Sequence, residues 1–180
     1  LIGNRRVETR QMWVNGHKVQ RAAQFPDGEL ERMIDFNPEE QTITIPVSQS
    51  VNPNRLQNAG QLEMIVHQRW AIAILRVKSI DVKDGQAVVR FHEPESYLEF
   101  AHPWPQPVIG GEKGNSSFCL TNALELLDQP GEWFQEYPSG SISVSNLRTI
   151  SFSYWPSAGS IGNIPEASPT PKTFFPVSFH

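Results

Sequence analysis

The sequence predicts a mostly β protein that contains an antiparallel β-sandwich or barrel-like domain. The first observation is a pair of dipeptides, Asn15-Gly16 and Asp84-Gly85, each lying between strand-like segments. Asn-Gly and Asp-Gly favour two-residue hairpin turns, because both turn positions need positive φ. The second is composition: 15 Pro and 12 Gly among 180 residues favour short strands and turns over long helices.

Charge and cysteine content exclude several classes of function. The formal net charge is −4, so the chain has no basic footprint for nucleic acid. The single cysteine, Cys119, excludes an intrachain disulfide and a cysteine-based metal site, and we expect an inert buried thiol there. His67 and His92 are not spaced as a metal pair, and no apolar run approaches the roughly 20 residues of a membrane span. We therefore predict no metal, no cofactor and no membrane span.

The first half of the chain begins with the Asn-Gly hairpin. Residues 1–9 are a polar lead-in segment, and strands are expected on either side of Asn15-Gly16, with Trp13 and Val19 facing the core. Residues 22–37 show a poor pattern, with a turn at 25–28 and a loop that begins at 28–30. Residues 42–47 alternate cleanly and predict a strand, which Pro46 marks as an edge or a bulge.

The most strand-like sequence follows in the middle of the chain. Residues 62–70 and 71–80 are rich in β-branched and apolar side chains, and residues 87–91 return after Asp84-Gly85. Residues 92–114 contain several prolines, which central strands exclude, so a long ordered loop is expected. We assign residues 10–120 to the β-sandwich or barrel-like domain.

A dense run of turns and apolar residues at 118–141 predicts a junction between two structural units. A short strand at 118–120 precedes a short helix at 122–128, which Thr121 or Asn122 can cap. Pro130-Gly131 then ends the helix. We assign residues 121–142 to this junction.

Residues 143–180 change character and are expected to form an aberrant or flexible tail. The only charged side chains after residue 142 are Arg148, Glu166 and Lys172. Residues 146–155 are compatible with one strand. Two explanations of the tail stay open: a reading-frame change or truncation that replaced the natural continuation, or a genuine flexible tail.

Three strings in order carry a resemblance to a known class of protein. The first string is R-Q-M-W-V-N-G at residues 10–16, and the second is Arg69-Trp70. The third is N-A-L-E-L-L-D-Q-P-G-E-W-F at residues 122–134. Together they resemble secreted bacterial proteins with a right-handed parallel β-helix, many of which are polysaccharide-degrading glycoside hydrolases. The resemblance spans roughly residues 5 to 142 and ends where the tail begins.

The resemblance implies an accessory role for this chain. Some β-helix enzymes carry an outer β-sandwich that is inserted between coils of the helix. In this chain the β-sandwich would be residues 10–120, and residues 121–142 would lead into the start of the β-helix. The full-length protein would hydrolyse a glycosidic bond in a polysaccharide, and it would be secreted or periplasmic with its export signal upstream. This region would pack against the missing β-helix, whose loss would expose Leu127, Trp133 and Phe134.

We expect no catalysis by this chain, because the family's catalytic carboxylates belong to the β-helix. The locally plausible pair is Glu93 and Glu95, which an extended chain would place on one face about 7 Å apart. The alternative interpretation of the segment around Glu93 and Glu95 is a strand end followed by a solvated turn, without a catalytic role.

The candidate substrate-binding residues are His67, Arg69, Trp70 and Trp104. An indole face stacks on sugar rings, and Arg donates to hydroxyl groups or carboxylates. The competing interpretation puts Trp70 in the core and Arg69 in a surface ion pair. The expected partner is a polysaccharide or oligosaccharide. The alternative functions are a stand-alone carbohydrate-binding or structural module and, through the aromatic segment 97–104, a protein-interaction module.

Overall fold

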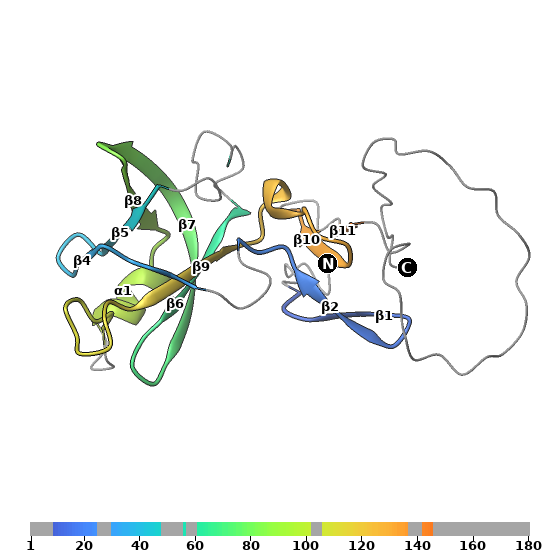
Figure 1. The fold of residues 1–180 in the computed structure, drawn as a ribbon, viewed down its shortest axis with the longest axis horizontal. Coiled ribbons are helices and arrows are strands. Elements are labelled where there is room, and N and C mark those ends of the chain that lie inside the picture. The colour runs from blue at the N-terminus through green and yellow to red at the C-terminus, as the bar shows by residue number, and fades with distance from the viewer. Residues whose placement is uncertain are drawn as a thin grey trace, which may run out of the picture.

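The computed structural model describes residues 9–24, 30–47, 56, 61–101, 106–136 and 142–145, and within them the fold is mostly β, as predicted. Two sheets lie side by side, one with strand order β1-β2-β10-β11 and one with order β3-β9-β6-β7-β8-β5-β4 (Figure 1). The smaller sheet consists of β1 (Met12–Val14), β2 (His17–Arg21), β10 (Glu132–Gln135) and β11 (Ile142–Val144). The larger consists of β3 (Glu31–Arg32), β4 (Asp35–Asn37), β5 (Thr42–Pro46), β6 (Glu63–His67), β7 (Ile72–Lys83), β8 (Gln86–Phe91) and β9 (Ser117–Thr121).

The larger sheet closes on itself and is barrel-like. β3 and β4 stand at its two ends, yet only Met33 and Ile34 separate them in the chain. The backbone N–H of Met33 donates to the carbonyl of Ser116 at 3.0 Å, and that of Ile34 donates to Thr44 at 2.7 Å. One segment therefore joins both edges of the sheet, which removes the exposed edge that an open sheet would leave. No strand was predicted within residues 22–37, because two strands as short as β3 and β4 carry no visible periodicity.

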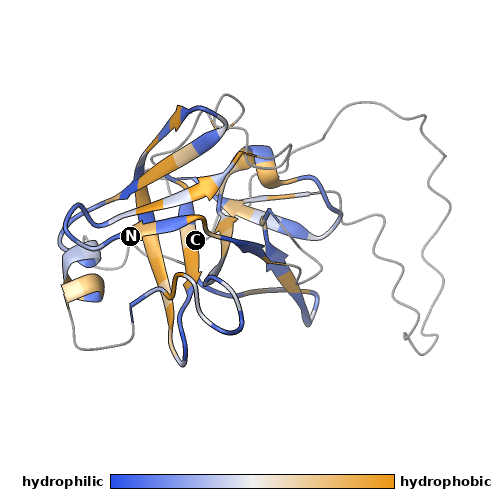
Figure 2. Cartoon of the chain, turned by 60° about the vertical axis from the view of Figure 1, so that its left-hand side comes forward, coloured by the Kyte–Doolittle hydropathy of each residue, from blue (hydrophilic) through white to orange (hydrophobic). Residues whose placement is uncertain are grey.

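The interior of the barrel holds the main hydrophobic core. Alternate positions of the long strands face inward, including Met64 and Val66 on β6 and Leu75 and Val77 on β7, all of them buried. Figure 2 shows hydrophobic stretches in orange along these strands and hydrophilic residues in blue at several turns. Burial of this kind contributes about 25 cal/mol for each Å² of apolar surface and stabilises the barrel.

A short helix, α1 (Glu95–Ala101), packs against the barrel where the sequence predicted only loop. Pro94 precedes its first turn, where a missing N–H costs nothing. Ser96 and Phe100 form its buried side, and the Phe100 ring lies 4.9 Å from Phe36 and 5.9 Å from Phe91 between ring centres. Tertiary packing of Phe100 thus stabilises a helix too short to form alone.

Both predicted hairpins are confirmed. Asn15 and Gly16 have φ of 50° and 78°, and Asp84 and Gly85 have φ of 51° and 75°, as two-residue turns of this kind require. β1 pairs with β2, and β7 pairs with β8, in antiparallel register.

The core assignment in the first hairpin was half correct. Val19 is buried, but Trp13 is 56% exposed, so the prediction for Trp13 was wrong. Met12 and Val14, its neighbours on β1, pack instead against the small cluster formed with Trp133. Successive side chains of a strand point to opposite faces, so Trp13 faces away from that cluster.

The junction contains β9 as expected, but the predicted helix is only a 3-10 turn, η2 (Leu124–Leu126). Thr121 ends β9, and Asn122 adopts a φ of 60°, so neither residue caps a helix. Ala123 holds the cap position without a side-chain hydrogen bond.

The aromatic pair of the junction is buried within this chain. Leu127, Trp133 and Phe134 are each less than 5% exposed, which corrects the expectation of a bare patch left by a missing β-helix. Ser143 and Val144 extend β11, which pairs with β10. The remainder of the predicted tail, including the strand at 146–155, lies outside the described residues.

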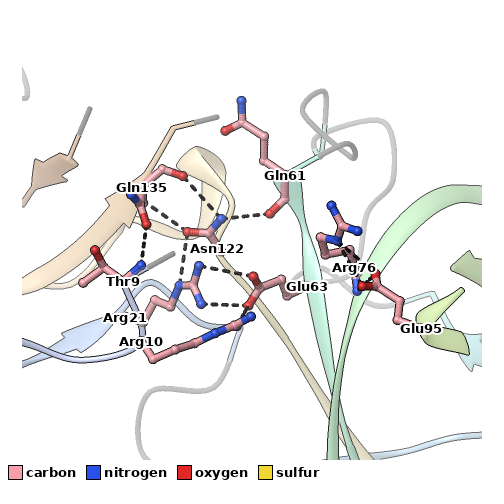
Figure 3. A network of polar contacts seen from close by, with 9 residues as sticks. All are labelled: Thr9, Arg10, Arg21, Gln61, Glu63, Arg76, Glu95, Asn122 and Gln135. Atoms are coloured by element: carbon pink, nitrogen blue, oxygen red, sulfur yellow. Dashed lines mark hydrogen bonds and ion pairs between the residues drawn. The ribbon is translucent and has the colours of Figure 1, made fainter. Parts of the chain in front are cut away.

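Polar contacts connect the two sheets (Figure 3). Glu63 on β6 is only 1% exposed and accepts from Arg10 at 2.8 Å and from Arg21 on β2 at 2.7 Å. Asn122 accepts from the Arg21 side chain and from the backbone N–H of Gln135 on β10, each at 3.2 Å. The guanidinium of Arg21 therefore ties the barrel to the smaller sheet.

Candidate functional site

A groove of about 780 Å³ lies between the β6–β7 turn and the loop before β9. Its size falls within the range of small-molecule sites, about 300 to 1,000 Å³. Both elements reach the same, lower side of the molecule in Figure 1. The groove is lined by Arg32, His67, Gln68, Arg69, Val108, Gly110, Gly111, Glu112, Lys113, Gly114, Asn115, Ser116 and Ser117.

One wall is the β6–β7 turn. The backbone N–H of Gln68 donates to the carbonyl of Ala71 at 2.9 Å, which closes a tight turn with Arg69 and Trp70 at its tip. Trp70 is 73% exposed, so the interpretation that placed it in the core was wrong. Gln68 is buried and donates to the carboxylate of Glu99 at 3.1 Å, which holds its side chain in place.

The opposite wall is the loop 108–116, which is tied to itself and to the barrel. The side-chain amide of Asn115 donates to the carbonyl of Met33 at 2.8 Å and accepts from the backbone N–H of Gly110 at 2.8 Å. A Cβ at Gly111 would lie 2.7 Å from a methyl group of Val108, so a larger residue there would force the loop to shift. Hydrogen bonds within the loop and to the barrel therefore hold this wall in place.

Strand pairing places residues of four strands side by side at the floor of the groove. Arg32 on β3 lies opposite Ser117 on β9, and the β6–β9 register, extended by one residue, puts Ser117 level with His67. His67 lies opposite Ile72 on β7. Arg32, Ser117, His67 and Ile72 thus form one row across four strands on the same face.

The four sequence-predicted binding residues have different outcomes. His67 and Arg69 line the groove together, and Trp70 stands beside Arg69 at the tip of the turn without lining it. Trp104 lies outside the described residues. Whether these residues bind substrate stays a prediction.

Sequence reasoning missed Arg32, Lys113 and Asn115. Arg32 and Lys113 are far apart in the chain and meet only through the β3–β9 pairing, which no local pattern reveals. The glycine-rich segment 110–114 was the available local signal.

The carboxylates do not form a catalytic pair in this groove. Glu112 is the only carboxylate among its lining residues. Glu95 begins α1 and accepts from Arg76 at 3.0 Å, whereas Glu93 is exposed in the preceding turn. The extended backbone that would have aligned Glu93 and Glu95 is therefore absent. Within the described residues, no cluster of three His, Cys, Asp or Glu side chains is placed to hold a metal ion, and no helix is long and apolar enough to cross a membrane.

Two comparisons relate this chain to known proteins. A family model described as the GH141 insertion domain matches residues 1–144. A solved structure named "Glycoside hydrolase" is 38% identical with a TM-score of 0.65. That match covers 74% of this chain but only 23% of the other, so this chain corresponds to a small part of that protein. No curated protein matches the sequence significantly.

The family match extends from the lead-in segment through β11, the last described strand. The similar solved structure agrees with it, since both point to an accessory domain of a glycoside hydrolase. The chain therefore belongs to the GH141 insertion-domain family.

Proposed function

We propose that this chain is a non-catalytic accessory domain of a polysaccharide-degrading glycoside hydrolase of the parallel β-helix class, secreted or periplasmic, and that it binds carbohydrate. The family match and the similarity to a glycoside hydrolase support the accessory role. Hydrolysis of a glycosidic bond needs two carboxyl groups about 5 to 10 Å apart across the bond. The groove is lined by one carboxylate, Glu112, which favours binding without catalysis.

The pairing of β2 with β10 supports the β-helix part of the proposal. These strands are parallel, with Gln20 opposite Glu132 and Arg21 opposite Trp133. All seven strands of the barrel-like sheet lie between them in the chain, so the barrel is inserted between two adjacent parallel strands. Adjacent parallel strands from successive coils are what a parallel β-helix consists of, and a β-helix that continued beyond residue 145 would pack against the smaller sheet.

The groove beside the exposed Trp70 is the observation that carries the carbohydrate-binding proposal. Sugars present hydroxyl groups at their edges and apolar C–H groups on their faces. Arg69, Lys113 and Ser117 line the groove with hydrogen-bonding groups, and the indole of Trp70 offers an apolar face next to them. The alternative function is a stand-alone carbohydrate-binding or structural module without a catalytic partner.

Affinity electrophoresis of the 180-residue chain through gels containing soluble polysaccharides tests this proposal. A sugar ring that covers about 60 Å² of the indole contributes about 1.5 kcal/mol. Trp70→Ala should therefore weaken binding by roughly tenfold. Trp13→Ala is the matched control, because Trp13 is also exposed but lies on β1 of the other sheet. Absence of retardation in neutral and acidic gels alike would instead support the structural-module alternative.

The β-helix part has a separate test in the natural gene product. The intact mass of that product should correspond to a protein much longer than 180 residues. Its coding DNA should encode β-helix coils after Ile142. A natural product that ends at His180 would overturn the assignment to a β-helix enzyme and leave the binding proposal standing.

A further inference from the structure

The groove is cationic although the chain as a whole is acidic. Arg32, Arg69 and Lys113 line it, together with His67, against the single carboxylate of Glu112. The formal net charge of the whole chain is −4, so this concentration of positive charge is local. Within the described part of the chain, no ion pair neutralises Arg32, Arg69 or Lys113.

The cations come from three separate elements and converge from both walls. Arg69 projects from the β6–β7 turn and Lys113 from the loop 108–116, while Arg32 stands on β3 at the floor. The Arg32 guanidinium donates to the backbone carbonyl of Asn115, which fixes the side chain and leaves its charge unpaired. Asn115 in turn anchors the loop that carries Lys113 to Met33. Cations held in place before a ligand arrives lose less conformational entropy on binding.

An apolar strip continues from the cationic floor. Ile72 lies opposite His67 in the same row of the sheet, and Ile74 follows two residues further along the same face. Both side chains are exposed, as is Trp70 at the turn. The surface therefore offers positive charge on one side and apolar side chains on the other.

We propose that this groove binds the carboxylate-bearing units of an acidic polysaccharide, a polymer that contains uronic acids. The inference rests on the proposed carbohydrate binding and adds the class of ligand. A uronic acid ring carries a carboxylate at one edge and C–H groups on its face. Arginine pairs with carboxylates through two parallel hydrogen bonds, and the ring face fits Trp70 and Ile72. A neutral polysaccharide would leave the charges of Arg32, Arg69 and Lys113 without a counter-charge.

The test compares matched polymers with the 180-residue chain. Polygalacturonate, alginate and a glucuronic acid polymer are each used beside the same polymer after its carboxyl groups have been reduced to alcohols. Binding is measured by affinity electrophoresis and calorimetry at about 0.15 M salt, where nonspecific surface attraction is screened. At least one acidic polymer should bind roughly tenfold or more tightly than its reduced form.

Charge-neutralising variants locate the effect. The double variant Arg69→Gln/Lys113→Gln should weaken binding of the acidic polymer by roughly tenfold. Lys78→Gln/Lys83→Gln is the control, because it removes the same charge from exposed positions of β7 that do not line the groove. Circular dichroism checks that all variants keep the same fold.

Three outcomes would overturn the inference. Equal binding of acidic and reduced polymers would disprove the ligand class while leaving carbohydrate binding intact. Equal losses in the two double variants, or equally tight binding of dextran sulfate or single-stranded DNA, would indicate general charge attraction. Binding of no polymer of either kind would overturn both this inference and the proposed carbohydrate binding.

Discussion

Glu63 is a buried acidic residue that two cationic side chains hold in place. Its carboxylate is 1% exposed and lies between the guanidinium groups of Arg10 and Arg21, whose side chains are 43% and 13% exposed. The Arg21 guanidinium also lies 5.2 Å from the centre of the Trp133 ring, at a distance that permits a cation–π contact. Removing the charge of Glu63 would leave Arg21 largely buried without its counter-charge.

Glu63→Gln is therefore expected to destabilise the fold by about 3 kcal/mol, the cost of breaking a buried ion pair from one side. Urea unfolding followed by tryptophan fluorescence measures the loss. Asp81→Asn is the matched control, because Asp81 pairs with Arg90 on the exposed surface. That pair should contribute less than about 1 kcal/mol. Equal losses in the two variants would contradict the role assigned to Glu63.

Glu132 is a second buried acid, in a different environment. Its Oε2 accepts from the backbone N–H of Asp128 at 3.1 Å and from that of Gln129 at 3.0 Å. Burial raises the pKa of Glu132 above its ordinary value of 4.5, the backbone N–H groups lower it, and the charge of Asp128 raises it. The net shift is upward, so the folded state binds this proton more tightly than the unfolded chain does.

The sign of the pH dependence follows from that shift. The contribution of Glu132 to stability is fully present below pH 4.5 and is lost as the pH rises through the raised pKa. Wild type should therefore lose stability relative to Glu132→Gln as the pH rises above 4.5. Urea unfolding of both proteins from about pH 4 to pH 8 measures the difference. Glu40→Gln serves as the exposed control, and a constant difference between wild type and Glu132→Gln across this pH range would refute the prediction.

At the scale of elements, local turn chemistry was the reliable signal and helix signals were not. The Asn15-Gly16 and Asp84-Gly85 turns formed where the dipeptides predicted, because positive φ is a property of the residues themselves. The predicted helix at 122–128 shortened to η2, because Asn122 uses its side chain to bond Gln135 and Gln61. Helix α1 was missed, because its stability comes from Phe100 and distant aromatic rings.

The smaller sheet includes β10 and β11, which lie near the end of the described chain. Shortening the chain therefore measures how much this sheet contributes to the free energy of unfolding. Trp133 on β10 is buried with Val19 on β2 and with Ile142 and Val144 on β11. A chain shortened to end at Ser145 keeps every strand that the structure describes and the whole family match, so it should unfold at the same urea concentration as the full chain. A chain that ends at Gln129 loses both strands and should be less stable by at least about 3 kcal/mol, the cost of removing one large buried aromatic side chain.

Unfolding of the three chains under identical conditions distinguishes the possibilities. Equal stability of the two shortened chains would show that the smaller sheet adds nothing to the barrel. A chain ending at Ser145 that is less stable than the full chain would show that residues beyond 145 stabilise the fold.

At the scale of the whole molecule, the candidate site is a product of long-range pairing. His67 and Arg69 were predicted because they lie two residues apart in the sequence, next to Trp70, and combine chemistry suited to sugars. Arg32 and Lys113 were not predicted, because they reach the groove only when β3 pairs with β9 and the following segment closes the barrel against β5.

The sequence by itself determined the β class, both hairpin turns, the buried thiol of Cys119 and the relation to glycoside hydrolases. These properties depend on residues that are adjacent or a few positions apart. Only the tertiary structure decided the closure of the barrel, the exposure of Trp13 and Trp70, the burial of Trp133 and the convergence of cations on one groove. The physical reason is that these four features depend on contacts between segments far apart in the chain, which no local pattern encodes.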